Sequence, residues 1–358
     1  MNIAIYSPYL DTAGGGEKYM LTIAECLSGE NAVDVLLDTH LKTLPLEHII
    51  KKIESLHGLD LSKVNFINAP LGAGSSSLAR FFFLRKYDYL FFLTDGSVFW
   101  NSAKNGIIHF QRPFDPSGHA GWLDAKLKTW RGAIFNSKFT GEYIQKRWKL
   151  SGQVIYPPVT KEHTQILKKK KQIVSVGRFF GFTKSKKHEV MISAFKKLID
   201  TQKISGWSLH LAGGAGVGDM SYVESLKKDS LGYPIFFYPN ISLEKRSILY
   251  GESSIYWHAA GYGESNPADF EHFGITTVES MMSGCVPVVV NKGGQKEIVE
   301  DGVSGLLWDT EDELVEKTLS LIQDEKMLKK LASGAIKHSQ LFSKEAFVRS
   351  IKKLVFLT

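Results

Sequence analysis

The stretch that decides the fold is Glu271-His272-Phe273-Gly274-Ile275-Thr276-Thr277-Val278-Glu279, which leads into the apolar run Val286–Val290. Its pattern predicts a glycine-containing loop, a short helix and a buried strand. Two glutamates, Glu271 and Glu279, flank the expected start of the helix. A helix start presents unpaired N–H groups and a partial positive charge, which suit a phosphate, and nearby carboxylates can hold hydroxyl groups. The pattern therefore indicates a nucleotide-sugar pocket.

The same residues also allow a purely structural interpretation. Thr276 is followed three residues later by Glu279, which is the spacing of a capping box. In that case Glu279 would only close the helix end. The surrounding chain has to distinguish the two interpretations.

Size and composition describe an ordinary globular protein. The chain has 358 residues, enough for two domains with separate cores, and is 43% hydrophobic and 23% charged. No apolar run reaches the length of a membrane span, and Met1–Tyr6 enters a strand-like pattern without a signal peptide. Cys26 and Cys285 lie far apart in apolar surroundings, so we expect neither disulfides nor a metal cluster, and a cytoplasmic location.

The charge balance favours anionic partners. The net charge is +7, with 44 Lys+Arg against 37 Asp+Glu, which suits phosphates, nucleic acid or an acidic membrane face. No nucleic-acid-binding module is recognisable, so we expect no nucleic-acid partner. The expected helix Leu78–Tyr87 combines Phe81–Phe83 with basic residues. It could contact an anionic membrane, although we favour a core-packed helix with basic ends that reach solvent.

The chain alternates strands and helices in two successive halves, which predicts an α/β protein with two Rossmann-like domains and parallel sheets. Pro157-Pro158 and the lysines at 168–171 suggest a solvent-exposed linker between them. We expect a first domain at residues 1–158, a linker at 159–171, a second domain at 172–340 and a final amphipathic helix at 341–358. This helix could pack anywhere, including back on the first domain. Ligands of such sheets bind beyond the carboxyl ends of the strands.

A basic loop follows one of these strand ends. Arg178 comes after the expected strand 172–176, and Lys186 and Lys187 precede the next helix. Arginine contacts phosphate through two N–H groups and lysine adds a compact charge, so the loop could neutralise a pyrophosphate leaving group. A solvated basic loop remains the simpler interpretation for each single lysine.

In the first half, Gly14-Gly15-Gly16 would let a ligand approach the backbone, and Asp95 and His109 lie at strand ends. The chain contains no phosphate loop of the Walker type, no G-x-S-x-G elbow and no H-E-x-x-H helix. It also lacks an Asp-x-Asp pair that would hold a divalent cation against a diphosphate. We therefore expect a site that needs neither metal nor cofactor.

These residues resemble the family 4 retaining glycosyltransferases, which have the GT-B fold of two facing Rossmann-like domains around an interdomain cleft. The similarity covers nearly the whole chain, and its most specific part is Glu271–Glu279 with its continuation to Val299. Supporting matches are Gly14-Gly15-Gly16-Glu17, His109, Asn136-Ser137, Tyr156-Pro157-Pro158-Val159 and Val176-Gly177-Arg178.

The resemblance implies a nucleotide-sugar donor in the second domain and a saccharide or lipid-linked acceptor in the first. Glu271 would hold donor sugar hydroxyls, Glu279 the ribose, and Arg178 with Lys186 the diphosphate, with Lys187 as an alternative to Lys186. His109 would lie beside the transferred sugar. Backbone contacts are implied at Gly15, Gly16, Phe273, Gly274, Ile275 and Thr276.

The implied reaction is metal-independent transfer of a hexose with retention, from GDP-mannose or a UDP-sugar, in glycan or polysaccharide biosynthesis. It would take place in the cytoplasm, with peripheral contact at the inner membrane face. The segment Trp257–Gly263 also resembles the corresponding segment of family members that use nucleotide-activated mannose. A nucleotide-sugar epimerase, a phosphorylase and a non-catalytic binding protein on the same fold remain alternatives.

Overall fold

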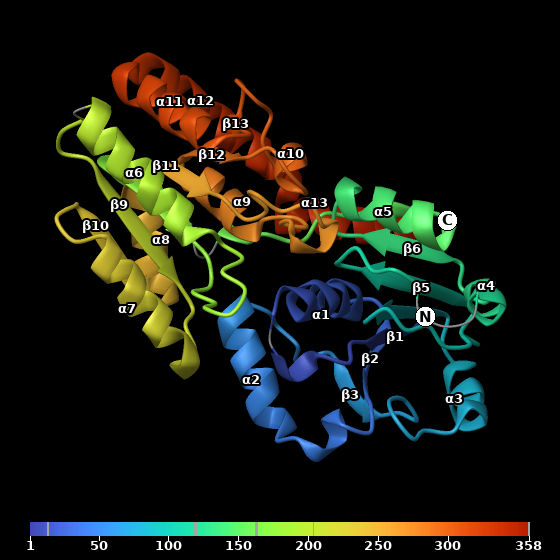
Figure 1. Cartoon of the computed structure of the whole chain (residues 1–358). Coiled ribbons are helices and arrows are strands. Elements are labelled where there is room, and N and C mark those ends of the chain that lie inside the picture. The colour runs from blue at the N-terminus through green and yellow to red at the C-terminus, as the bar shows by residue number, and fades with distance from the viewer. Residues whose placement is uncertain (13, 117–119, 162–163, 203, 357–358) are drawn as a thin grey trace. The chain divides into compact units, whose positions relative to one another are not determined.

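The computed structural model describes residues 1–12, 14–116, 120–161, 164–202 and 204–356. The chain divides into two compact units. The first comprises Met1–Pro158 and Lys344–Thr358, and the second comprises Val159–Ser343. Each unit is an open, parallel β-sheet with helices on both faces, so the expected α/β class is confirmed (Figure 1).

The first unit contains a seven-stranded sheet with the order β3-β2-β1-β4-β5-β6-β7. Its strands are β1 (Asn2–Tyr6), β2 (Ala32–Leu37), β3 (Asn65–Asn68), β4 (Tyr89–Leu93), β5 (Asn105–Phe110), β6 (Gly132–Phe135) and β7 (Gly152–Val154). Its helices are α1 (Gly15–Ser28), α2 (Leu46–His57), α3 (Ser77–Leu84), α4 (Ala120–Leu127), α5 (Lys138–Trp148) and α13 (Lys344–Phe356).

Two cores cover the faces of this sheet. Helices α1, α2 and α13 pack on one face, and α3, α4 and α5 pack on the other. The final helix joins the first unit through Phe347, Ile351 and Val355, which are buried in the core of α1. The Tyr89 hydroxyl also donates to the Val355 carbonyl at 3.2 Å. The amphipathic tail thus completes the apolar face of the first unit.

The second unit contains a six-stranded sheet with the order β10-β9-β8-β11-β12-β13. Its strands are β8 (Lys170–Val176), β9 (Ser208–Gly213), β10 (Ile235–Pro239), β11 (Ser253–His258), β12 (Val286–Val290) and β13 (Leu306–Trp308). Its helices are α6 (His188–Gln202), α7 (Met220–Asp229), α8 (Leu243–Glu252), α9 (Ile275–Met282), α10 (Gln295–Ile298), α11 (Glu311–Gln323) and α12 (Glu325–Ser339).

Strand order reverses once in each sheet, between β1 and β4 in the first unit and between β8 and β11 in the second. All pairs are parallel, so every strand of a sheet ends at the same edge. In open α/β sheets, ligands bind in the crevice beyond the carboxyl ends at such a switch point. The two switch points are therefore the first places to look for ligand sites.

The exposure expected for the lysine block is wrong for Lys169. Its ammonium group is partly buried and donates to the carbonyls of Ser283, Ser253 and Tyr250 at 2.6, 2.8 and 3.3 Å. Lys170 and Lys171 begin β8. The whole stretch 159–171 is grouped with the second unit, because Val159 already bridges to Ser343 there.

The core-packed interpretation of the aromatic helix holds for one side only, where Phe83 and Leu84 pack in the core on this face of the sheet. In α3 only Leu84 is fully buried, whereas Leu78, Phe81 and Phe82 are 66, 40 and 60% exposed. Two short helices, α4 and α10, were not expected from the sequence. Among the described residues, no helix combines the length and the apolar character that crossing a bilayer requires.

Candidate functional site

The switch point of the second sheet gathers most of the expected donor-site residues. Arg178 follows β8, His258 ends β11, and Glu271 precedes α9 in the loop that leaves β11. Strands β8 and β11 are neighbours in the sheet. Residues that are far apart in sequence therefore converge at one edge.

Glu271 is the centre of a small charged cluster. Its Oε2 atom accepts a hydrogen bond from Lys186 Nζ at 2.5 Å and another from His258 Nε2 at 3.0 Å. Burial alone would raise the pKa of Glu271, but Lys186 and His258 outweigh it and hold the pKa below its ordinary value. The carboxylate is therefore ionised at neutral pH and ready to accept hydroxyl groups.

The two neighbouring lysines have different partners. Lys186 contacts Glu271, whereas Lys187, which has a positive φ of 54°, forms an ion pair with Glu264. The absence of a side chain at Gly177 makes room for the Lys186 stem at the strand end. A Cβ at Gly177 would lie only 2.8 Å from Lys186 Cγ and would clash with it. The ammonium group of Lys186 has three protons, so contact with Glu271 leaves donors for a further ligand.

The start of α9 is built around Gly274. This residue is the N-cap and has φ 122°, and a Cβ there would come within 2.3 Å of Gln295 Nε2. Gln295 is fully buried, accepts from the Thr277 hydroxyl at 2.9 Å and donates to the Phe273 carbonyl. The glutamine side chain thereby fixes the loop and leaves the first helical N–H groups, at Ile275 and Thr276, facing outward from the helix end.

The capping-box interpretation of Thr276 and Glu279 is wrong. Gly274 is the N-cap, so Thr276 lies inside the first turn, where its hydroxyl is hydrogen-bonded to the Tyr256 hydroxyl at 2.8 Å. Glu279 is only 7% exposed, and its carboxylate accepts from Tyr250 at 3.2 Å and Arg246 at 3.3 Å. Glu279 therefore presents a prearranged carboxylate on the first turns of α9 rather than closing the helix end.

Gly293 and Gly294 pack closely against the backbone of the loop that carries Glu271 and His272. A Cβ at Gly293 would approach the Glu271 carbonyl to 2.3 Å, and one at Gly294 would approach the His272 carbonyl to 2.5 Å. The Gly294 N–H donates to the Glu271 carbonyl at 2.8 Å. These glycines thus contact the backbone of the loop that carries Glu271.

Arg178 is exposed at the end of β8. Within the part of the chain that the structure describes, its guanidinium group makes no hydrogen bond or ion pair with the protein. It is therefore a free cation at the switch point, available to an anionic ligand.

In the first unit, the glycine loop caps α1. Gly14 is the N-cap, and its N–H donates to Glu17 Oε2 at 2.8 Å. Glu17 is buried and also accepts from Ser7 and Thr12. Gly15 is exposed, whereas Gly16 packs against Gln111, since a Cβ there would lie 2.8 Å from the Gln111 amide. Of the two glycines, only Gly15 presents its backbone at the surface.

His109 lies in the interior of the first unit. Its side chain is 0% exposed and stacks on Tyr19 with ring centroids 3.8 Å apart. Burial lowers its pKa to about 3, so the ring is neutral at physiological pH. Nδ1 lies 3.3 Å from the Ile134 carbonyl, and Nε2 has no partner among the described residues. The structure thus places His109 at its expected strand but with its side chain packed in the core.

The structure adds functional candidates that the sequence did not single out. His258, Arg246, Tyr250 and Gln295 hold the two glutamates and the loop between them. Two of them had a sequence signal: His258 ends an apolar strand, and Gln295 lies within the Glu271–Val299 match. Among the described residues, no group of three or more His, Cys, Asp or Glu side chains could hold a metal ion.

Solved structures share this architecture across the entire chain. A glycosyltransferase from Rickettsia africae superimposes with a TM-score of 0.74 at 15% identity and covers 100% of this chain and 99% of that chain. The Anabaena protein HepE in complex with UDP gives a TM-score of 0.72 at 17% identity, with both chains fully covered. The fold is that of the GT-B glycosyltransferases.

Sequence relatives identify the family. Residues 158–338 match the model of the glycosyl transferases group 1, and the chain belongs to this family. The GDP-Man:Man(3)GlcNAc(2)-PP-Dol alpha-1,2-mannosyltransferase of Xenopus laevis is 30% identical over 217 residues, which are 53% of this chain and 42% of that protein. The match thus spans less than half the length of this curated relative. The glycosyltransferase resemblance of the sequence is confirmed.

Proposed function

We propose that this glycosyltransferase moves a hexose from a nucleotide-sugar to a saccharide or lipid-linked acceptor in glycan biosynthesis, with retention of the anomeric configuration. The observation that carries the proposal is the Glu271 cluster next to the start of α9. An ionised carboxylate, a lysine with free protons and outward-facing helix amides are combined at one switch point. Such a combination suits a ligand with both hydroxyls and phosphates.

GDP-mannose is the donor that we favour over a UDP-sugar. Two sequence relatives, at 30 and 27% identity over 217 and 247 residues, carry GDP-Man in their names. The structural neighbours that were solved in complex with UDP are under 20% identical to this chain, so their similarity supports the fold but not the choice of donor. The base is therefore best judged from the sequence relatives.

The cluster suggests a division of roles. Glu271 would accept the hydroxyls of the transferred sugar, and the buried Glu279 carboxylate would accept those of the ribose. Arg178 and Lys186 would neutralise the diphosphate, with Phe273, Gly274, Ile275 and Thr276 donating or presenting backbone groups to it. Lys187 is a weaker candidate for the phosphate, because Glu264 already pairs with it.

Retention is proposed to proceed by front-face attack. The bond between the anomeric carbon and the phosphate oxygen breaks while the acceptor oxygen bonds to the same face. The acceptor proton passes to the departing phosphate, so no covalent enzyme intermediate is required. Arg178 and Lys186 would stabilise the negative charge that develops on this phosphate, which removes the need for a divalent cation.

We also propose that the protein works at the cytoplasmic face of an anionic membrane. The exposed Leu78, Phe81 and Phe82 of α3 are followed by exposed Arg85 and Lys86. Apolar and aromatic side chains next to basic ones are typical of helices that lie in a membrane interface. A lipid-linked acceptor would be reached from such a position.

A donor screen tests the proposed function. Thermal unfolding would be followed with a panel of GDP- and UDP-sugars, and donor hydrolysis would be measured in parallel. A donor at 100 times its dissociation constant should stabilise the protein by about 2.7 kcal/mol. Absence of both a shift and hydrolysis with every donor would refute the proposal. A chelator should leave hydrolysis unchanged, and strong inhibition would refute the metal-free part.

A further inference from the structure

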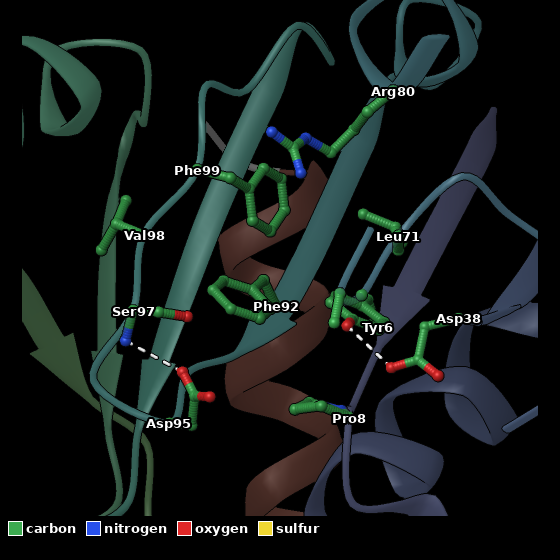
Figure 2. A pocket seen from close by; sticks show the side chains of 12 residues that line it. Tyr6, Pro8, Asp38, Leu71, Arg80, Phe92, Asp95, Ser97, Val98 and Phe99 are labelled. Atoms are coloured by element: carbon green, nitrogen blue, oxygen red, sulfur yellow. Dashed lines mark hydrogen bonds between the residues drawn. The ribbon is translucent and has the colours of Figure 1, made fainter. Parts of the chain in front are cut away.

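A cavity lies at the switch point of the first sheet, and Asp95 is one of its lining residues. It has a volume of about 330 Å³ and is lined by Tyr6 of β1, Phe92 of β4, residues that follow β1, β2, β3 and β4, and Arg80 from α3 (Figure 2). This is the lower end of the range for small-molecule sites, enough for a ligand of the size of one sugar unit.

The cavity lies on the opposite face of the sheet from His109. Tyr6 and Phe92 line it and belong to the core under α3 to α5. His109 is paired with Leu93, which belongs to the core under α1. Because successive side chains of a strand point to opposite faces, Phe92 and Leu93 face apart. The cavity is thus a different site from the region that the family resemblance assigns to His109.

The two carboxylates at the acidic end of the cavity, Asp38 and Asp95, are held in place by hydrogen bonds. Asp38 is 4% exposed, and its Oδ1 atom accepts the N–H groups of His40 and Leu41, each at 2.9 Å. The Tyr6 hydroxyl donates to Oδ2 at 3.1 Å. Asp95 is exposed and is oriented by the Ser97 N–H at 2.9 Å. Two fixed carboxylates therefore offer acceptors for hydroxyl groups.

Arg80 forms the basic end. Figure 2 shows it opposite Asp95, with the rings of Phe99 and Phe92 between them. Its guanidinium carbon lies 5.1 Å from the Phe99 ring centre, and Nη2 donates to Ser77 at 3.1 Å. Nε is buried without a partner, and within the described residues Arg80 forms no ion pair. A partly desolvated guanidinium group without a counter-ion is suited to an oxyanion.

The geometry points to a binding site for a phosphorylated sugar unit, with the phosphate at Arg80, the hydroxyls at Asp38 and Asp95, and the ring against Phe92 and Phe99. The inference rests on the proposed function and specifies its acceptor as a saccharide joined to a lipid through phosphate. The exposed Leu78, Phe81 and Phe82 lie on the same helix as Arg80, so the lipid part would leave the cavity along α3.

Calorimetric titration with glucose 1-phosphate tests this site, with excess GDP and UDP present to occupy any donor site. Wild-type protein should bind glucose 1-phosphate more tightly than glucose or inorganic phosphate. Arg80→Gln should weaken binding about 10- to 100-fold, the effect of losing a hydrogen bond to a charged group, and Arg80→Lys should weaken it less. Asp95→Asn should weaken the binding of glucose 1-phosphate but leave the binding of inorganic phosphate unchanged.

Arg147→Gln is the matched control, because Arg147 also lies over an aromatic ring, Tyr143 at 5.2 Å, but outside the cavity. It should leave the affinity unchanged. Equal affinities in wild type and both folded Arg80 variants, or inorganic phosphate binding as tightly as glucose 1-phosphate, would overturn the inference. The donor screen is read separately on wild-type protein, so failure of the proposed function and failure of this site are distinguishable.

Discussion

Lys169 should contribute more to stability than any other residue of its lysine block. Its ammonium group joins the end of α8, through Tyr250 and Ser253, to the end of α9, through Ser283. A positive charge is favourable at both helix ends, because their carbonyls carry partial negative charge. Lys169→Met keeps most of the apolar stem and removes the three hydrogen bonds to these carbonyls, together with a long contact to Cys285 Sγ at 3.9 Å.

The magnitude follows from which carbonyls lose their donors. Cys285 Sγ lies 3.1 and 3.2 Å from the Tyr250 and Ser253 carbonyls, so these two carbonyls still share its one S–H proton as a weak donor. The Ser283 carbonyl loses the 2.6 Å bond from Lys169. Because burial of the ammonium group already opposes the interaction, we expect a net cost of about 2–4 kcal/mol. This corresponds to a decrease in Tm of roughly 5–15 °C for a domain of this size.

Thermal and urea unfolding of Lys169→Met, Lys168→Met and wild type would measure this effect. Lys168 is the adjacent, exposed lysine, so its replacement controls for the loss of charge and should change Tm by no more than about 1–2 °C. Equal Tm values for the two variants would show that the three carbonyl contacts do not stabilise the fold. The reasoning about buried cations at helix ends would then be refuted.

Three further predictions concern the site and its surroundings. Glu271→Gln should lower kcat/KM for donor turnover about 10- to 150-fold without unfolding the protein. Glu264→Gln, which affects the partner of Lys187, should have a small effect. If Glu264→Gln had the larger effect, the roles of Lys186 and Lys187 would be exchanged. Gly274→Ala should destabilise the second unit more than Gly232→Ala does. Both positions have a positive φ, but of the two only Gly274 lacks space for a Cβ. Equal midpoints of urea unfolding for the two variants would contradict this prediction. The pKa of His109 is lowered to about 3 from 6.5, so as pH falls below 6.5 the unfolded chain gains a proton that the folded chain does not, and stability decreases. Between pH 7.5 and 5, wild type should therefore lose about 2 kcal/mol relative to His109→Gln in urea unfolding, and a constant difference would mean that His109 titrates freely.

The sequence by itself determined the order of elements and the edge at which the site lies. Apolar strands and strand-end glycines act over a few residues, so the strand Val286–Val290 and the end of the strand 172–176 were located closely. Parallel strands must end at one edge, so Arg178 and Glu271 could be assigned to the same side of a sheet before any contact was known.

Only the tertiary structure decided which groups are paired and which are buried. Lys186 and Lys187 are adjacent in sequence, yet their partners Glu271 and Glu264 belong to the loop after β11. Likewise, Lys169 is held by carbonyls more than 80 residues away, whereas Phe82 stays exposed in an apolar helix. Burial and pairing depend on segments that are distant in sequence, and local patterns carry no information about them.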